Sequence, residues 1–233
     1  MKTILFVSGK GGTGKTTMAC LLSELLSEKH KVALFDADLT GPSVASVYGI
    51  NNAPLVSSGM ITPTNVNENL QVFSIGFIEF KSMLWTANAE AEFCINCLKT
   101  TNWDPETEYL IIDGSPGTGE SVQALLNTVD VVLPVSEPTV VSVADCKKVI
   151  NAANFIRDSN VEWVIINKTN VVTKTTVGKK EKEITVELWL DKMTNKEIEE
   201  TLKTRILAEI PFVADRDRIK KEMSPIVEVV LNE

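Results

Sequence analysis

The stretch Gly9-Lys10-Gly11-Gly12-Thr13-Gly14-Lys15-Thr16-Thr17 decides the fold of this chain. It follows the apolar run 4–7, whose length and β-branched residues suit a buried strand. It leads into residues 18–26, an apolar-periodic segment that predicts a helix. A strand, a glycine-rich turn and a helix in this order are the context that a phosphate-binding loop requires. We therefore predict a nucleotide site at residues 9–17.

The residue types in this stretch match the parts of a nucleotide phosphate chain. Glycines let successive backbone N–H groups converge into a nest for phosphate oxygens, and the helix N-terminus adds its partial positive charge. We expect Lys15 to reach the β- and γ-phosphates, the Thr16 hydroxyl to ligate magnesium and Thr17 to donate to the α-phosphate. The other predicted cofactor-binding residues of the loop are Gly9, Lys10, Gly11, Gly12, Thr13 and Gly14. The alternative is a chance glycine-rich turn, which the complete GxxxxGK[ST] spacing disfavours.

Lys10 is a second lysine, directly after the first glycine of the loop. Cradling a phosphate within one subunit does not need it. The pattern GKGGTGKTT resembles the deviant Walker A loop of the ParA/MinD superfamily. The resemblance implies an ATP-sandwich homodimer in which Lys10 reaches the nucleotide of the partner subunit. The alternative is a solvated lysine.

Length and charge are those of a single soluble domain, which we take as a P-loop ATPase domain over residues 1–233. With a formal net charge of −8, the chain has no global field that attracts nucleic acid or an anionic membrane. The first apolar run is too short for a signal peptide, and no segment approaches the length of a membrane span. Four cysteines without an export signal argue against a disulfide framework. We expect a cytoplasmic protein with no nucleic-acid partner and no stable membrane anchor.

Carboxylates follow two of the apolar runs that indicate buried strands. Asp36 and Asp38 come directly after residues 31–35, and Asp113 comes directly after residues 109–112. Doubly wound sheets bind their ligands at the carboxyl ends of the strands, where these side chains would lie. We expect Asp113 to hold magnesium through water, and one carboxylate of the first pair to secure a loop or a metal-bound water while the other faces the γ-phosphate. The predicted magnesium residues are Thr16, Asp36 and Asp113.

The segments around these carboxylates resemble those of the Mrp-type ATPases, which are scaffold and carrier proteins for iron–sulfur clusters. DADLTGPSVASVYGI, residues 36–50, resembles the first switch of that family, and DGSPGTG, residues 113–119, resembles the second. Ser115 stands where the family more often has proline. The match implies that Asp38 positions or polarises the attacking water, with Lys10 and Lys15 as the other catalytic residues. The alternative is that the two carboxylates of the first switch only cap a loop.

Cys94 and Cys97 lie within residues 87–100, which we expect to be a helix, so they share one side of it. Thiolates at this spacing could ligate an iron–sulfur cluster or zinc, with a second pair from a dimer mate completing four ligands. The alternative is core packing, because Ala91, Cys94 and Leu98 make an apolar helix face and cysteine is among the most buried residue types. In Mrp-type proteins the bridging CxxC pair lies later, in a region where this chain has no such pair.

The apolar run 161–166 ends in Asn167, whose amide can both donate to and accept from the N7/N6 edge of adenine. A GTPase would carry aspartate for guanine at the position of Asn170, so we predict ATP as the nucleotide. In the superfamily that this chain resembles, the loop opened here by Pro211 and Phe212 lies along the adenine. Both residues therefore join the predicted cofactor-binding set.

Residues 171–190 are the part least like the family. Two segments, 171–177 and 184–190, flank the charged turn Gly178-Lys179-Lys180-Glu181-Lys182. The second segment alternates apolar and polar residues, as a half-buried strand does. We expect a β-hairpin here, with the lysines as a solvated tip.

Together these segments predict a doubly wound α/β fold, with a mostly parallel sheet and helices on both faces. The predicted function is ATP hydrolysis by a homodimer that uses magnesium and is linked to iron–sulfur cluster carriage or assembly for a client protein, with a cluster shared across the dimer. The alternative is a MinD-like regulatory switch that recruits a protein partner without any cluster. DNA partitioning of the ParA kind is disfavoured by the acidic balance.

Overall fold

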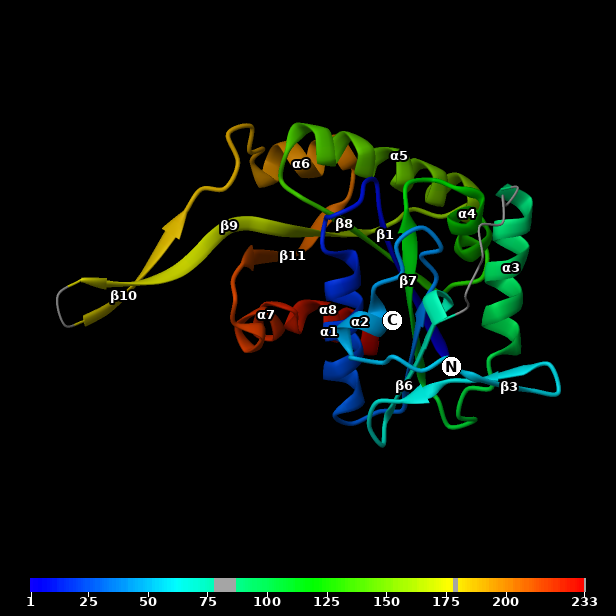
Figure 1. Cartoon of the computed structure of the whole chain (residues 1–233). Helices are drawn as coiled ribbons and strands as arrows, with labels where there is room; N and C mark the ends of the chain where they lie inside the picture. The colour runs from blue at the N-terminus through cyan, green and yellow to red at the C-terminus, as the bar shows by residue number, and fades with distance from the viewer. Residues whose placement is uncertain (78–86, 178–179, 233) are drawn as a thin grey trace.

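The computed structural model describes residues 1–77, 87–177 and 180–232. Among these residues, a sheet of nine strands in the order β10-β9-β8-β1-β7-β2-β6-β5 forms the centre, and β11 joins it beside β9 (Figure 1). Neighbouring strands are parallel, except that β5 and β10 pair antiparallel with β6 and β9. The strands are β1 (Lys2–Ser8), β2 (Val32–Asp36), β5 (Thr64–Asn65), β6 (Leu70–Ser74), β7 (Tyr109–Pro116), β8 (Val131–Ser136), β9 (Trp163–Val177), β10 (Lys180–Val186) and β11 (Arg205–Phe212).

Helices cover both faces of the sheet, which confirms the predicted doubly wound fold. One face packs against α1, α7 and α8, and the other packs against α3, α4, α5 and α6. No helix within the described ranges is both long and apolar enough to cross a membrane. The helices are α1 (Lys15–Ser27), α2 (Val44–Val47), α3 (Ala87–Thr100), α4 (Glu120–Leu126), α5 (Val140–Arg157), α6 (Asn195–Leu202), α7 (Arg216–Glu222) and α8 (Ser224–Asn232), with a 3₁₀ turn η1 (Ile75–Phe77).

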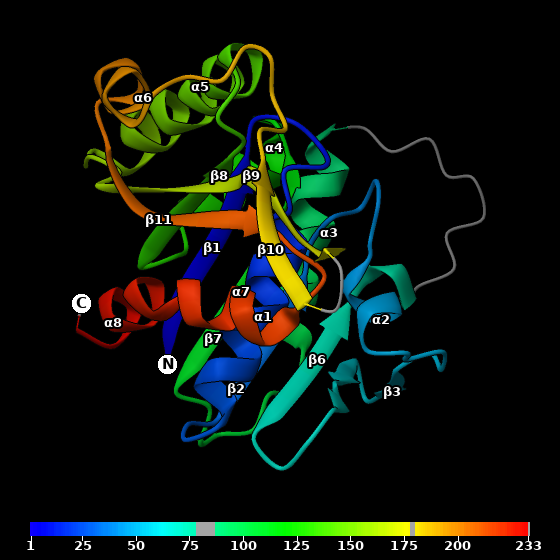
Figure 2. The ribbon, with the colours of Figure 1, turned by 90° about the vertical axis from the view of Figure 1, so that its left-hand side faces the viewer.

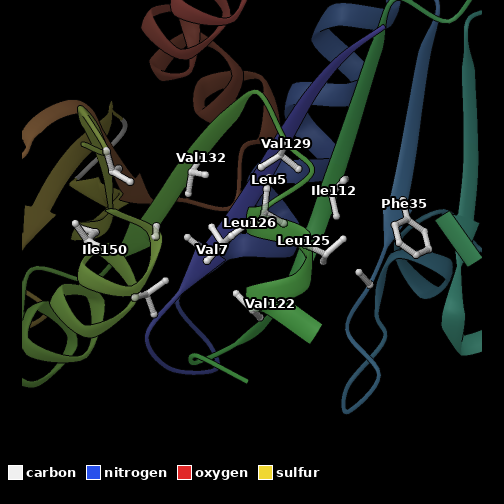
Figure 3. Packing of buried hydrophobic residues seen from close by; sticks show 14 of the residues in the cluster. Leu5, Val7, Phe35, Ile112, Val122, Leu125, Leu126, Val129, Val132 and Ile150 are labelled. Carbon is white, nitrogen blue, oxygen red and sulfur yellow. The ribbon is translucent and has the colours of Figure 1, made fainter. Parts of the chain in front are cut away.

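β1 shows how the sequence sets these layers. Successive side chains of a strand point to opposite faces, so Leu5 and Val7 join one core while Ile4 and Phe6 join the other. Figure 3 shows Val7 beside Leu126 of α4. These four side chains of β1 are fully buried. β1 is therefore a central strand, and its carboxyl end delivers the glycine-rich loop to the edge of the sheet.

The parallel strands bring the carboxylates of the sequence analysis to that same edge. Asp36, at the end of β2, is the register partner of Asp113 in β7. Asp113 is also paired with Phe6 of β1, two residues before that strand ends. The glycine-rich loop and both carboxylates thus lie together, as expected of a doubly wound sheet.

β9 and β10 form an antiparallel hairpin, as predicted for residues 171–190. Their pairing runs from Val171 with Val186 to Val177 with Lys180. The pairing of β9 with β11 ends at Val171, so the hairpin continues without that neighbour. Residues 171–177 and 180–186, called the arm below, extend away from the rest of the sheet (Figure 1). In Figure 2 the arm points toward the viewer, with α7 beside it.

The second strand of the arm is shorter than predicted, because β10 ends at Val186 rather than at residue 190. Residues 187–193, called the return segment below, run back to the body of the molecule. There Trp189 Nε1 donates to the carbonyl oxygen of Lys168 over 2.7 Å. Trp189 thus faces the body while Leu188 and Leu190 are exposed. The alternation of apolar residues in this segment therefore does not mark a half-buried strand.

Residues 51–69, to which the sequence analysis assigned no element, contain regular structure. β3 (Leu55–Ser57) and β4 (Met60–Thr62) pair as a small antiparallel sheet. Ser58 and Gly59 join them with φ angles of 52° and 78°. The sequence feature that could have predicted this hairpin is the pair Ser58-Gly59, which suits a two-residue turn with left-handed backbone.

Candidate functional site

The β1–α1 loop forms a cradle at the carboxyl edge of the sheet. Gly12 and Gly14 have φ angles of 82° and 94°, which glycine adopts without strain. A Cβ atom at Gly14 would lie 2.1 Å from Asn167 Nδ2, whereas one at Gly11 or Gly12 would meet nothing within 4 Å. The loop is therefore packed against the protein at Gly14 and open at Gly11 and Gly12, where phosphate oxygens would approach its N–H groups.

The other loop residues complete this cradle. A Cβ atom at Gly9 would lie 2.2 Å from the carbonyl carbon of Asp145 in α5, so only glycine fits that position. The Thr13 side chain is buried, and its hydroxyl has no hydrogen-bond partner in the part of the chain that the structure describes. Thr17 lines the cavity in front of the loop. A buried hydroxyl without a partner and an open set of backbone donors both fit a bound polyphosphate.

Lys15 and Thr16, the first two residues of α1, meet Asp113 of β7. Lys15 Nζ lies 3.3 Å from Asp113 Oδ1, and Thr16 Oγ1 donates to Asp113 Oδ2 over 2.5 Å. Burial raises the pKa of Asp113, and the Lys15 charge and the Thr16 hydrogen bond act against that rise. Magnesium in nucleotide sites is held by one or two carboxylates together with substrate phosphates, and a hydroxyl beside a carboxylate fits that demand. These two oxygen donors would hold it here.

Asp36 secures the first switch. Its Oδ2 accepts from the backbone N–H groups of Ser43 and Val44 over 3.1 and 3.0 Å, and from the Ser74 hydroxyl over 2.8 Å. Its Oδ1 accepts from the N–H of Asp38 over 3.2 Å. Burial, and then the charge of Asp113, raise the pKa of Asp36 to about 6. Of the two roles expected for the first carboxylate pair, this geometry favours loop securing for Asp36.

Asp38 lies at the wall of the cavity in front of the loop. Its Oδ1 accepts three hydrogen bonds, from the N–H and hydroxyl of Thr40 over 3.1 and 2.7 Å and from the N–H of Gly41 over 3.1 Å. These bonds fix the buried Asp38 carboxylate against a turn whose donors, Thr40 and Gly41, are exposed. A carboxylate held in this way can orient a water molecule in the cavity, which is the role that the family resemblance implies for Asp38.

The cavity joins four segments of the chain. It has a volume of 530 Å³ and is lined by the β1–α1 loop, the first switch, Pro116 of the second switch and Lys168 of β9. A larger cavity of 880 Å³ lies between α5 and α6 and contains none of the predicted site residues. The smaller cavity is the candidate site, because predicted site residues line it and none line the larger one.

Lys10 is tied within its own chain. Its Nζ lies 2.7 Å from Glu137 Oε2, and Lys168 Nζ lies 2.8 Å from Glu137 Oε1. Lys168 also donates to the carbonyl oxygen of Gly12. Burial acts to raise the pKa of Glu137, but the hydrogen bonds from both lysines outweigh it and hold that pKa below its ordinary value. Lys10 must exchange this carboxylate for another anion before it can reach a nucleotide elsewhere.

Of the predicted adenine residues, Asn167 contacts the loop. Asn167 Nδ2 donates to the carbonyl oxygen of Thr13 over 2.7 Å, so its amide supports the cradle in this structure. Pro211 and Phe212 are the last residues of β11 rather than the start of a loop, and the Phe212 side chain is half exposed. Both lie at the end of β11, which pairs there with the part of β9 that follows Asn167.

Cys94 and Cys97 face the sheet from α3. Both are buried in the same core as Leu5 and Ile112, with exposed fractions of 0% and 3%. Burial raises the pKa of the Cys94 thiol to about 12 and that of Cys97 to about 11. In the described part of the chain, no group of three or more His, Cys, Asp and Glu side chains is arranged to hold a metal ion. This placement favours the core-packing alternative for the pair.

Sequence reasoning gave no role in the site to Glu137 or Lys168. Glu137 follows the strand β8 directly, much as Asp36 ends β2, whereas Asp113 lies within β7, which continues to Pro116. An acidic residue at the end of an apolar run is the signal that could have found Glu137. Lys168 has a φ angle of 56°, which is uncommon outside glycine and is visible only in the structure.

Comparisons with known proteins agree with this geometry. A family model described as "ParA: NUBPL iron-transfer P-loop NTPase" matches residues 1–232. The chain is similar to the iron–sulfur cluster carrier protein of Rickettsia bellii, with 41% identity over 122 residues, 51% of this chain and 38% of that protein. The protein of the same name from Rickettsia felis is 38% identical over 149 residues, 62% of this chain and 46% of that protein. The matched part thus spans less than half the length of these curated relatives.

Two solved structures resemble the chain over its whole length. A nucleotide-binding protein from Archaeoglobus fulgidus, in complex with ADP, has a TM-score of 0.68 and 25% identity, and the match covers 88% of that chain. The MinD cell division protein of Aquifex aeolicus has a TM-score of 0.69 and 18% identity, with 98% of that chain covered. At that identity the second match shows likeness of fold alone.

Proposed function

The chain belongs to the ParA family of NUBPL-type iron-transfer P-loop NTPases, and on that premise we propose that it binds ATP with magnesium at the β1–α1 loop and hydrolyses it. The observation that carries this proposal is the cluster of Lys15, Thr16 and Asp113 at a 530 Å³ cavity beside an open glycine cradle. One sheet takes strands from Lys2 to Phe212, which supports residues 1–233 acting as a single P-loop domain.

In the proposed reaction, water attacks the γ-phosphorus in line with the bond to the β–γ bridging oxygen, and that bond breaks to release ADP and phosphate. Catalysis of this kind is largely positioning and charge stabilisation. Asp38 orients the water, while Lys15 stabilises charge on the phosphate oxygens. Thr16 and Asp113 would hold magnesium, which would supply further positive charge beside the phosphate chain. The partner's Lys10 adds a second cation in a homodimer.

We further propose that hydrolysis serves iron–sulfur cluster carriage for a client protein. This part is supported by the family and by the carrier proteins that the chain resembles. The cluster is cargo, and the described residues of one chain, as folded here, do not gather a ligand set for it. A cargo site shared by two chains therefore needs ligands other than Cys94 and Cys97 in their present, buried positions.

A second candidate is a regulatory ATP switch that recruits a protein partner and carries no cluster. The burial of both paired cysteines favours it. Purification without oxygen, followed by iron and sulfide analysis, separates the two candidates. Iron and acid-labile sulfide in stoichiometric amounts support carriage, whereas their absence after reconstitution supports the switch.

Replacing the loop lysine tests the nucleotide site itself. Lys15→Ala should weaken ATP binding by about 100-fold, because a charge-assisted contact to phosphate is worth about 3 kcal/mol. Titration with a fluorescent ATP analogue measures the Kd, and thermal unfolding without nucleotide checks that the variant is folded. Lys148→Ala, at an exposed lysine of α5, is the matched control. ATP affinity within twofold of the parent in the Lys15 variant would contradict the assignment.

A further inference from the structure

The arm forms one edge of the sheet: in the part of the chain that the structure describes, no strand pairs with the outer side of β10. β10 pairs with β9 alone, and β9 has lost its other neighbour at Val171. The side chains from Lys182 to Val186 are exposed, including Ile184 by 38% and Val186 by 48%. A two-stranded hairpin is only marginally stable in water, and open strand edges are templates for pairing with another chain. A partner that covers the arm would stabilise it.

The return segment carries two more exposed apolar side chains to the neighbourhood of Lys10. Leu190 is fully exposed and Leu188 is exposed by 39%. The hydrogen bond from Trp189 to the Lys168 carbonyl holds this segment against the site. Lys168 is tied in turn to the same carboxylate as Lys10. Leu188, Leu190 and Lys10 therefore belong to one surface.

The start of α5 extends this surface on the other side of that carboxylate. Val140 and Val141 follow Glu137 closely and are exposed by 56% and 61%. The return segment hydrogen-bonds to the same loop, through the N–H of Met193 and the carbonyl oxygen of Pro138 over 2.8 Å. Exposed apolar side chains gathered beside a functional site mark an interaction surface.

We propose that the arm and the return segment form a dimerisation element that binds a second copy of this chain across the nucleotide site. The inference rests on the proposed function, because it takes from it that Lys10 reaches the partner subunit's nucleotide. If Lys10 does so, the surface around it lies against the second copy. Leu188 and Leu190 then lie in the same contact, and the arm reaches past it along the partner.

Charge favours a second copy over a nucleic acid as the occupant. Residues 172–182 contain four lysines and one glutamate, whereas the whole chain has a net charge of −8. A basic segment of an acidic chain is attracted to another molecule of the same chain. The acidic remainder of the chain would repel a polyanion that approached this segment.

The arm is connected to α7 through Glu183 and to the nucleotide cradle through Lys168. Glu183 of β10 pairs with Arg218 of α7, with 2.7 Å between Oε2 and Nη1. Lys168, three residues before the arm, donates to the carbonyl oxygen of Gly12 in the cradle. A bound triphosphate that displaces Lys168 from the Gly12 carbonyl would also change the position of the arm, which begins three residues later. Dimerisation through the arm is therefore expected with ATP and not with ADP.

Sedimentation velocity of the whole chain with ADP or with a non-hydrolysable ATP analogue tests the proposal. Leu190→Ser should leave analogue binding to the monomer unchanged and raise the dimer Kd by about tenfold, since one leucine would lose its burial. Phe155→Ser is the matched control, because Phe155 is also exposed, by 88%, but lies on the last turns of α5. The control should dimerise like the parent.

A second measurement follows the arm directly. Amide hydrogen exchange in residues 180–186 should slow at least about tenfold when the ATP analogue replaces ADP, because covered strand edges exchange slowly. The β3–β4 hairpin, which is also exposed, should exchange at the same rate in both states.

The outcomes separate this inference from the function on which it rests. Dimerisation of Leu190→Ser with the Kd of the parent overturns the inference and leaves the proposed function intact. So does protection of the arm only by added oligonucleotide. A parent that binds the analogue but stays monomeric overturns both the trans action of Lys10 and the dimerisation element. A parent that binds no nucleotide overturns the proposed function itself.

Discussion

Asp36 combines complete burial with four accepted hydrogen bonds, and this makes the stability of the protein depend on pH. Burial and the neighbouring Asp113 raise its pKa from the ordinary 3.8 to about 6. Because the folded-state pKa is the higher one, the folded state binds the proton more tightly than the unfolded state. The stability that this proton contributes is present below about pH 4 and is lost as the pH rises through about 6.

Asp36→Asn should remove this dependence. The parent without nucleotide or metal should lose about 2 kcal/mol of unfolding free energy, through this group, between about pH 4.5 and about pH 7.5. The variant cannot titrate at that position and should lose correspondingly less. Urea unfolding at both pH values measures the difference. Glu120→Gln, at an exposed carboxylate, should behave like the parent, and an Asp36→Asn profile that also matches the parent would contradict the raised pKa.

At the scale of elements, α3 presents its cysteines to the sheet rather than to solvent. A metal needs thiolates, and a thiol with a raised pKa forms few of them near neutral pH. Core packing predicts instead that α3 is held to the sheet partly by these two side chains. The helix as a whole was predicted correctly over residues 87–100. The sequence left open only whether Cys94 and Cys97 pack in the core or ligate a metal.

The double variant Cys94→Ser, Cys97→Ser should therefore lower the unfolding free energy by about 2–4 kcal/mol, because each buried hydroxyl costs about 1–2 kcal/mol without a partner. Cys94→Ala, Cys97→Ala should cost less, since no polar group is buried. Chemical denaturation measures both, and Cys20→Ser, a buried thiol of α1, calibrates the cost of one hydroxyl. Iron and sulfide content should stay unchanged in both double variants; if it disappears, the pair ligates the cargo.

At the scale of the whole molecule, Lys10 and Asp38 can be separated by mixing subunits. Each nucleotide in the proposed dimer uses the Asp38 of its own chain and the partner's Lys10. Lys10→Ala and Asp38→Ala proteins should each be inactive alone. Mixed in equal amounts they should recover about a quarter of the parent's ATPase rate, because half of the dimers are mixed and each has one complete site. Phosphate release measures the rate.

The structure adds a condition to this experiment. Lys10 is paired with Glu137 in its own chain, so it must leave that carboxylate to act on a partner. Recovery should therefore require ATP and should rise with protein concentration, as dimer formation does. Lack of recovery at every mixing ratio and concentration would place Lys10 in its own site and remove the trans geometry.

The sequence by itself determined the doubly wound fold, the cradle at residues 9–17 and the carboxylates at the strand ends. These features are local: glycine spacing, strand length and the residue that follows a strand are set by neighbours along the chain, and parallel strands then place them at one edge. The hairpin at residues 171–190 was predicted on the same local grounds.

Only the tertiary structure decided how distant segments meet. It joined Glu137 to Lys10 and Lys168, turned the Asn167 amide onto Thr13, and directed Cys94 and Cys97 into the core. Each of these contacts joins residues from separate elements, so it depends on the twist of the sheet and the rotation of each helix rather than on local spacing. For the same reason Leu188 and Leu190, which read as one face of a strand, came to lie exposed beside the site.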